Sequence, residues 1–130
     1  MKINETCTLV HDLAKQKGWY ENPKTPLEAH MLIVSEIAEA SEEVRKDTPP
    51  IYANIKIQVA FDEIMYQRTT NLELIRNNLI KPEGEAIELA DAVIRIFDYC
   101  AYRGIDLEEA IALKHNYNKS RSKRHGGKKL

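Results

Sequence analysis

The clearest amphipathic pattern in the chain is residues 85–103, EAIELADAVIRIFDYCAYR. Its apolar side chains recur every three or four residues, at Ile87, Ala90, Ile94, Phe97 and Ala101. This spacing places them on one face of an α-helix. Gly104 follows directly, and glycine commonly ends helices. The stretch therefore predicts a long helix with one face directed at a core.

Three other segments also have helical signals. Residues 4–17 have apolar side chains at helical spacing and stop before a glycine. Thr25-Pro26-Leu27-Glu28 predicts a capping box, which opens a helix that reaches Arg45 or Lys46. Asp106 predicts the cap of a last helix that runs to about Lys119.

The segment between these helices, residues 51–80, fits two patterns. Ile55, Ile57, Val59 and Phe61 alternate as in a strand, whereas Ile51, Ile55, Val59 and Ile64 fit a helix. We expect a helix, because a single strand would have no partner with which to pair.

The whole chain of 130 residues has the size of one domain, and it holds only 5 Gly and 5 Pro. These residues cluster between long periodic segments. We therefore predict a single all-α domain over residues 1–130, a four- to five-helix bundle. Residues 51–80 form a long connection in it, and residues 120–130 form a basic C-terminal tail.

The composition limits the classes of partner. A total of 19 Lys and Arg against 20 Asp and Glu argues against a general nucleic-acid binder. The cations are concentrated in residues 119–130, which suit an anionic partner. Cys7 and Cys100 do not make a disulfide framework, and no apolar run has the ~20 residues of a membrane span. We expect a cytoplasmic protein with reduced thiols that does not insert in a membrane.

The second predicted helix has an acidic stripe. Glu36, Glu39 and Glu43 follow one another at three and four residues and share one face. Apolar side chains occupy the opposite side, at Leu27, Met31, Val34 and Ala38. A plain surface helix does not need apolar residues on both sides of its acidic stripe.

The helix at 85–103 repeats this arrangement, because Glu88 and Asp91 lie three residues apart beside its apolar stripe. If the two helices pack antiparallel, Glu36 and Glu39 face Glu88 and Asp91. Four clustered carboxylates favour a hard divalent cation, Mg²⁺ first and Mn²⁺ next. The alternative is that each acidic pair is a solvated helix face. The pairs Glu39/Glu42 and Glu85/Glu88 have the same spacing, so spacing alone leaves the register open.

The last predicted helix has a cationic face. Lys114, Asn118 and Arg121 lie four and three residues apart on one side. Fixed cations beside a metal suit a triphosphate. Alternatively, these side chains are solvated or interact with the helix dipole. Residues 124–130, which begin with Arg124, either form a free tail or fold over a bound phosphate.

Several of these motifs together resemble the MazG-like all-α nucleoside triphosphate pyrophosphohydrolases. The motifs are SEIAEASEE at 35–43, KPEG at 81–84, ELAD at 88–91, GIDLEEA at 104–110 and the Lys-x-x-x-Asn of residues 114–118. The family has an E-x-x-E on one helix and an E-x-x-D on a later one. The resemblance places these on Glu36, Glu39, Glu88 and Asp91, as ligands of Mg²⁺.

The resemblance implies hydrolysis between the α and β phosphates of a nucleoside triphosphate, in nucleotide-pool house-cleaning. Glu39 would position or deprotonate the attacking water. Lys114, Asn118, Arg121 and Arg124 would bind the phosphates. Family members assemble as dimers or tetramers, so we expect a homodimer or homotetramer. We expect no stable nucleic-acid partner.

The chain also departs from the family pattern. Residues 51–80 are longer than the usual connection, and Ser35 stands where many relatives have a further Glu, which leaves one or two Mg²⁺ ions open. Two other functions fit the same residues. One is a narrower relative that acts on dUTP or phosphoribosyl-ATP, and the other is a non-enzymatic helical interaction module.

Overall fold

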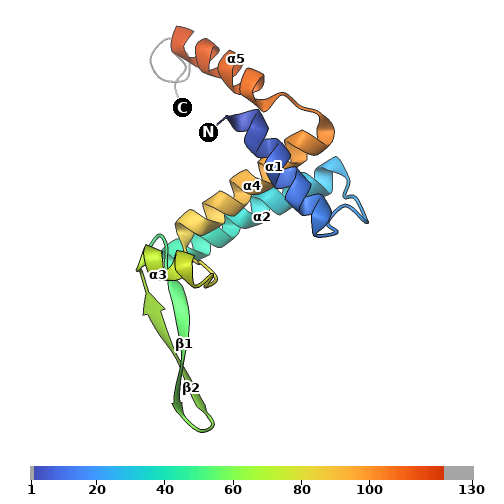
Figure 1. Ribbon diagram of the computed structural model, residues 1–130. Coiled ribbons are helices and arrows are strands. Elements are labelled where there is room, and N and C mark those ends of the chain that lie inside the picture. The colour runs from blue at the N-terminus through green and yellow to red at the C-terminus, as the bar shows by residue number, and fades with distance from the viewer. Residues whose placement is uncertain (1, 122–130) are drawn as a thin grey trace. The chain divides into compact units, whose positions relative to one another are not determined.

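The computed structural model describes residues 2–121, and within this range it has five helices and two strands (Figure 1). Their bounds are α1 Ile3–Gln16, α2 Pro26–Arg45, β1 Ala53–Ala60, β2 Glu63–Thr69, α3 Leu72–Asn77, α4 Glu85–Arg103 and α5 Leu107–Ser120.

The four helices expected from apolar spacing are confirmed as α1, α2, α4 and α5. The capping box is present at the start of α2, where the Glu28 amide donates to Thr25 Oγ1 at 3.2 Å and the Thr25 amide donates to Glu28 Oε1 at 3.3 Å. Asp106 caps α5 by accepting from the Glu109 amide at 3.0 Å. These side chains satisfy amide groups that have no partner inside the helix.

The prediction of an all-α fold is wrong. Residues 51–80 contain the antiparallel strands β1 and β2 and the short helix α3, so the protein is a mixed α and β fold. The expected helix assumed that the strand pattern had no partner. Residues 63–69 supply that partner, and only Phe61 and Asp62 connect the two strands, because Ala60 pairs with Glu63.

The chain divides into two compact units. One unit combines the N-terminal residues up to Pro23 with the residues from Ile96 onward, and the other is Lys24–Arg95. The N-terminal half of α4 belongs to the second unit and its C-terminal half to the first. Each unit is described below by itself.

In unit Lys24–Arg95, α2 and the N-terminal half of α4 lie side by side and run antiparallel (Figure 1). A hydrogen-bonded group joins the end of α2 to the start of the hairpin. Glu43 accepts from Thr48 Oγ1 at 2.6 Å and from the Tyr52 hydroxyl at 2.9 Å. Tyr52 also pairs with Glu83, just before α4. The hairpin is therefore fixed at its base to both helices.

In the other unit, α1 contacts α5 and the C-terminal half of α4. The Asn4 amide donates to Glu108 at 2.7 Å. His11 Nδ1 lies 2.8 Å from Asp98 Oδ1, and the rings of Tyr20 and Tyr102 lie 4.8 Å apart beside it. Cys7 and Cys100 are buried here as free thiols.

The buried apolar side chains are mostly small: Cys7, Ala14, Ala40, Tyr52, Ala53, Ile75, Ala92 and Cys100. Many large apolar side chains of α2 and α4 are exposed in the single chain, with Leu27 at 75% and Met31 at 63%. Among the described residues, no helix is both long enough and apolar enough to span a bilayer.

Candidate metal centre

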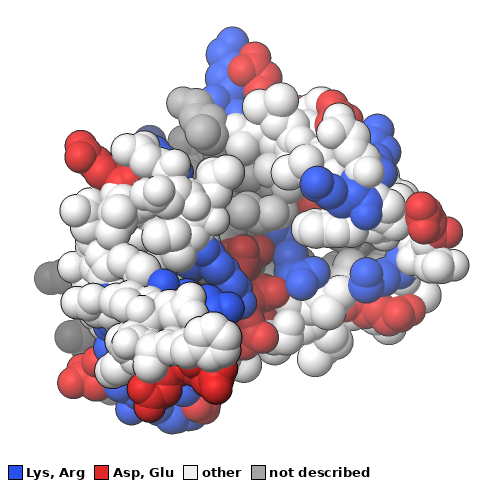
Figure 2. Space-filling model, turned by 60° about the horizontal axis from the view of Figure 1, so that its bottom comes forward, with Lys and Arg blue, Asp and Glu red and all other residues white. Residues whose placement is uncertain are grey.

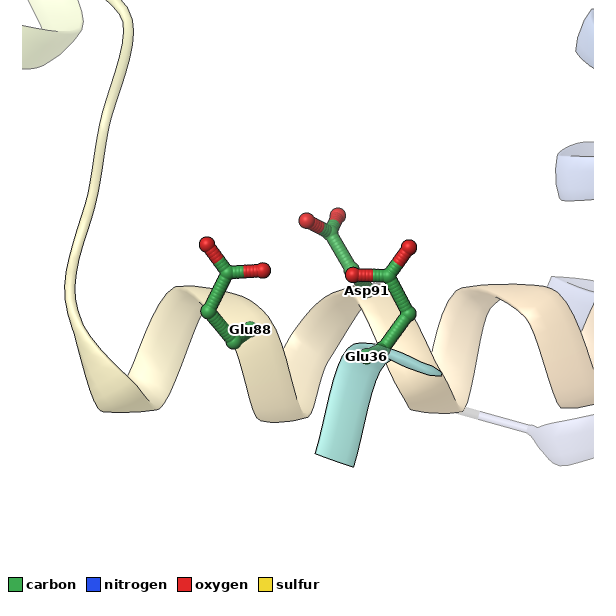
Figure 3. A group of neighbouring side chains, drawn as sticks. All are labelled: Glu36, Glu88 and Asp91. Carbon is green, nitrogen blue, oxygen red and sulfur yellow. The ribbon is translucent and has the colours of Figure 1, made fainter. Parts of the chain in front are cut away.

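Three carboxylates converge in unit Lys24–Arg95. Glu36, Glu88 and Asp91 each offer an oxygen, and these oxygens all lie within 4.8 Å of one another. Figure 3 shows Glu88 and Asp91 rising from one side of α4, with the Glu36 side chain beside Asp91. Glu36 is buried, and the other two are partly buried. We call these three residues the acidic trio.

The acidic trio follows from helix geometry. Glu88 and Asp91 are three residues apart on α4, so their side chains share one face. The antiparallel course of α2 brings Glu36 against that face. Arg95 lies one turn beyond Asp91 and donates from Nε to Glu36 Oε1 at 2.8 Å. The two helices are thus joined by an ion pair at the edge of the trio.

Arg95 is the main group that favours the charged form of Glu36. Burial is the largest single influence and favours the neutral acid, but the hydrogen bond and charge of Arg95, together with the contacts to Glu39 and Glu88, outweigh it, so the pKa of Glu36 lies below its ordinary value. Glu36 is therefore ionised at neutral pH, and one of its oxygens is already occupied by the guanidinium.

The pKa values of the other two members, Glu88 and Asp91, are raised instead. Burial, as the largest cause, and then the neighbouring Glu39, Glu36 and Asp91 together raise the pKa of Glu88 to about 7. Burial also raises the pKa of Asp91, followed by the repulsion of Glu36, whereas Arg95 and Lys81 lower it. Burial first, and repulsion between neighbouring carboxylates second, therefore disfavour the ionised forms of Glu88 and Asp91.

The donor set of the acidic trio fits a hard divalent cation. It consists of carboxylate oxygens from two rigid helices, which is the chemistry that Mg²⁺ and Mn²⁺ prefer. A cation there would supply the positive charge that favours the ionised form of Glu88 and Asp91.

Glu39 lies at the border of the acidic trio, beside Glu36 and Glu88. Its side chain is exposed, and it is not a member of the acidic trio. Its carboxyl is nevertheless close enough to those of Glu36 and Glu88 to affect their pKa values. The structure thus brings together three of the four expected ligands, with the fourth at the border.

The expected phosphate-binding residues lie on α5 and directly after it, in the unit that does not contain the acidic trio. The Lys114 ammonium lies 5.0 Å from the centre of the Tyr117 ring, and the Arg121 guanidinium lies 5.6 Å from the same ring. Both cations therefore share one aromatic side chain, and Asn118 is exposed near them. Arg124 lies outside the described residues.

Sequence reasoning missed the roles of Arg95 and Lys81. Arg95 is four residues after Asp91 and seven after Glu88, so its place on the acidic face was readable from the sequence. Its partner on α2 was not, because that contact depends on the register between two helices. Lys81 lies in the turn before α4, where no periodicity indicates the direction of a side chain.

The charges on the surface are mixed. Figure 2 shows Lys and Arg side chains, in blue, interspersed with Asp and Glu side chains, in red, on the face that it draws. This agrees with the formal net charge of −1.

Comparison with known proteins gave no relatives: no family model matches the chain, and neither a curated protein nor a solved structure matches it. The resemblance to the MazG-like enzymes therefore rests on the sequence motifs alone.

Proposed function

We propose that the protein is a Mg²⁺-dependent nucleoside triphosphate pyrophosphohydrolase, which cleaves between the α and β phosphates. The observation that supports this most is the acidic trio, with carboxylate oxygens from two helices within 4.8 Å of one another. The reaction consumes one water and releases a nucleoside monophosphate and pyrophosphate.

In this proposal Glu36, Glu88 and Asp91 hold the cation, and Mn²⁺ is a possible substitute. A Mg²⁺ held by these residues would neutralise phosphate oxygens and would make a coordinated water more acidic. Arg95 keeps Glu36 ionised and oriented through its hydrogen bond of 2.8 Å. It is therefore a positioning residue.

Glu39 is the proposed general base. Its carboxyl is exposed to solvent and adjacent to Glu36 and Glu88, where it can accept a proton from a water at the edge of the acidic trio. Lys114, Asn118, Arg121 and Arg124 are the proposed phosphate-binding residues. Tyr117 supports two of them, because it contacts both Lys114 and Arg121.

We also propose a homodimer or homotetramer in the cytoplasm. The stripe Leu27, Met31 and Val34 on α2 is more than half exposed in the single chain, which favours burial against another subunit. Both cysteines are free thiols, as expected in a reducing compartment.

The test is a product analysis over a panel of canonical and modified nucleoside triphosphates, with dUTP and phosphoribosyl-ATP included. We expect the protein to release pyrophosphate and to require Mg²⁺ for this activity. The rate of release should fall by roughly two orders of magnitude or more in Asp91→Asn and in Glu39→Gln. Glu85→Gln, a carboxylate on the same helix outside the acidic trio, is the matched control and should keep its activity.

Orthophosphate as the product would contradict cleavage at the α–β bond. Silence of the folded protein over the whole panel would favour the interaction module. Equal activity in Asp91→Asn and Glu85→Gln would show that the acidic trio is not the site of the reaction.

A further inference from the structure

The hairpin has an unpaired strand edge. Its sheet contains β1 and β2 alone in the part of the chain that the structure describes. The outer side of β1 is occupied at its base, where Tyr52 pairs with Glu83 and Asn54 donates to Glu83 at 2.9 Å. The outer side of β2 has no such neighbour among residues 2–121. Free amide and carbonyl groups along an edge are a template for another strand.

The side chains near this edge are unusually exposed for their type. Phe61 is 93% exposed, Tyr66 68% and Met65 59%. A two-stranded hairpin is barely stable alone in water, and it needs further strands or a covering layer. The hairpin extends beyond the ends of α2 and α4 in its unit (Figure 1), so its outer part has room for a partner.

We propose that β2 pairs antiparallel with β2 of a second copy of this chain, about a two-fold axis at Met65. The result is a four-stranded sheet in the order β1, β2, β2, β1. Residues directly opposite each other in an antiparallel pair point to the same face. A two-fold axis perpendicular to the sheet must therefore pass midway between the two copies of one residue. With Met65 as that residue, Met65 faces Met65 and Ile64 faces Tyr66 of the second copy.

Charge complementarity selects this register. With Met65 on the axis, Asp62, in the turn directly before β2, lies across from Arg68 of the second copy, and the symmetry creates the same pair again. Neither residue forms an ion pair within residues 2–121, although the charge of Arg68 acts on Glu43 and helps to lower its pKa. The Arg68 guanidinium lies over the Tyr52 ring at 4.6 Å, which fixes its position. Stacking uses the face of a guanidinium and leaves the N–H groups at its edge free for a carboxylate.

Other ways of pairing the strands of two copies do not bring opposite charges together. With the axis at Tyr66, Arg68 lies opposite Ile64. Strand β1 has Lys56 as its sole charged residue, so pairing two β1 strands offers no opposite charge. The register at Met65 also sets Phe61, the most exposed of these side chains, opposite Thr69 of the second copy.

The test is cysteine cross-linking. In Met65→Cys the two thiols face each other across the axis, within the Cα separation of about 4.4–6.8 Å that a disulfide needs. Diamide oxidises the two thiols to one disulfide and takes up the two hydrogens. In the control Tyr66→Cys the two thiols are offset by about 7 Å along the strands, in addition to the strand spacing of about 4.8 Å. The unmodified protein measures any background from Cys7 and Cys100.

We expect most of Met65→Cys, and almost none of Tyr66→Cys, to form covalent dimers on a non-reducing gel. In the Met65→Cys background, Asp62→Lys should slow cross-linking roughly two- to thirty-fold, because it removes two opposite-charge pairs per dimer. Adding Arg68→Glu to that variant should restore the rate.

Equal cross-linking of the two cysteine variants, or more in Tyr66→Cys, would overturn the register. An absence of cross-linking in Met65→Cys that circular dichroism shows to be folded would overturn the pairing itself. The inference does not rest on the proposed function, because no nucleotide or metal is used, so each can fail without the other.

Discussion

Glu36 and Arg95 form the contact on which the charge of the acidic trio depends. The Glu36 side chain is 9% exposed and that of Arg95 is 39% exposed. A buried carboxylate that loses its partner retains the cost of its desolvation. The pair is therefore worth more than the exposed pairs on the helix surfaces.

Replacing Arg95 tests this directly. We expect Arg95→Met to lower the free energy of unfolding by about 1–2 kcal/mol at neutral pH, because Glu36 then lacks its charged donor. Arg45→Met is the control, because Arg45 pairs with Glu42 at an exposed position. This substitution should lower the free energy of unfolding by less than about 0.5 kcal/mol. Urea unfolding of both variants measures the difference, and equal effects would contradict the special role of Arg95.

Glu88 should make the stability of the metal-free protein depend on pH. Its pKa is about 7 in the folded chain against an ordinary 4.5, so the folded state binds the proton more tightly than the unfolded one. Its contribution to stability is therefore fully present below pH 4.5 and is lost as the pH rises to about 7. Glu88→Gln, which cannot ionise, should gain stability relative to the unmodified protein as the pH rises through this window.

The measurement is urea unfolding of both proteins in EDTA at about pH 5 and about pH 8. Glu85→Gln on the same helix is the control. A stability difference between Glu88→Gln and the unmodified protein that stays constant with pH would show that Glu88 does not carry the raised pKa.

At the scale of elements, the turn before α4 is the tightest part of unit Lys24–Arg95. Gly84 has φ +116°, and a Cβ atom built on it would lie 2.3 Å from the carbonyl oxygen of Pro50. The same carbonyl accepts from the Ala86 amide at 3.0 Å, which joins the segment after α2 to the start of α4. This turn helps to set the register that brings Glu36 against Glu88 and Asp91.

Substituting Gly84 should therefore strongly destabilise the fold. We expect Gly84→Ala to lower the free energy of unfolding by about 3 kcal/mol or more, since backbone must move to admit the methyl group. Gly104→Ala is a matched control with φ +67° and open space around its Cβ position, and should cost about 1 kcal/mol. Thermal unfolding compares them, and a mild Gly84→Ala would contradict the close approach.

The elements differ in how well the sequence predicts them. The helices α1, α2, α4 and α5 were predictable, because caps such as Thr25 and Asp106 and the apolar spacing act locally. The hairpin was not, because its two-residue turn at Phe61 and Asp62 lacks the Asn-Gly or Asp-Gly signal and because strand pairing is not local. For the acidic trio, spacing predicted the pair on α4, whereas the position of Glu39 at the border, rather than among the three, depends on the contact between helices.

At the scale of the whole molecule, the single chain leaves much apolar surface uncovered. The exposed stripe of α2 and the edge of β2 are separate surfaces in unit Lys24–Arg95. If both surfaces are interfaces between copies of the chain, one of them forms a dimer and the other joins two dimers into a tetramer. Closed assemblies of this kind need two different two-fold contacts.

The most direct test of the central claim, that the acidic trio binds a divalent cation, is a Mn²⁺ titration followed by electron paramagnetic resonance. We expect the unmodified protein to bind Mn²⁺, Mg²⁺ to displace it, Glu88→Gln and Asp91→Asn to lose the binding, and Glu85→Gln to retain it. Absence of Mn²⁺ binding by the folded protein, or equal binding by all four proteins, would contradict the metal centre.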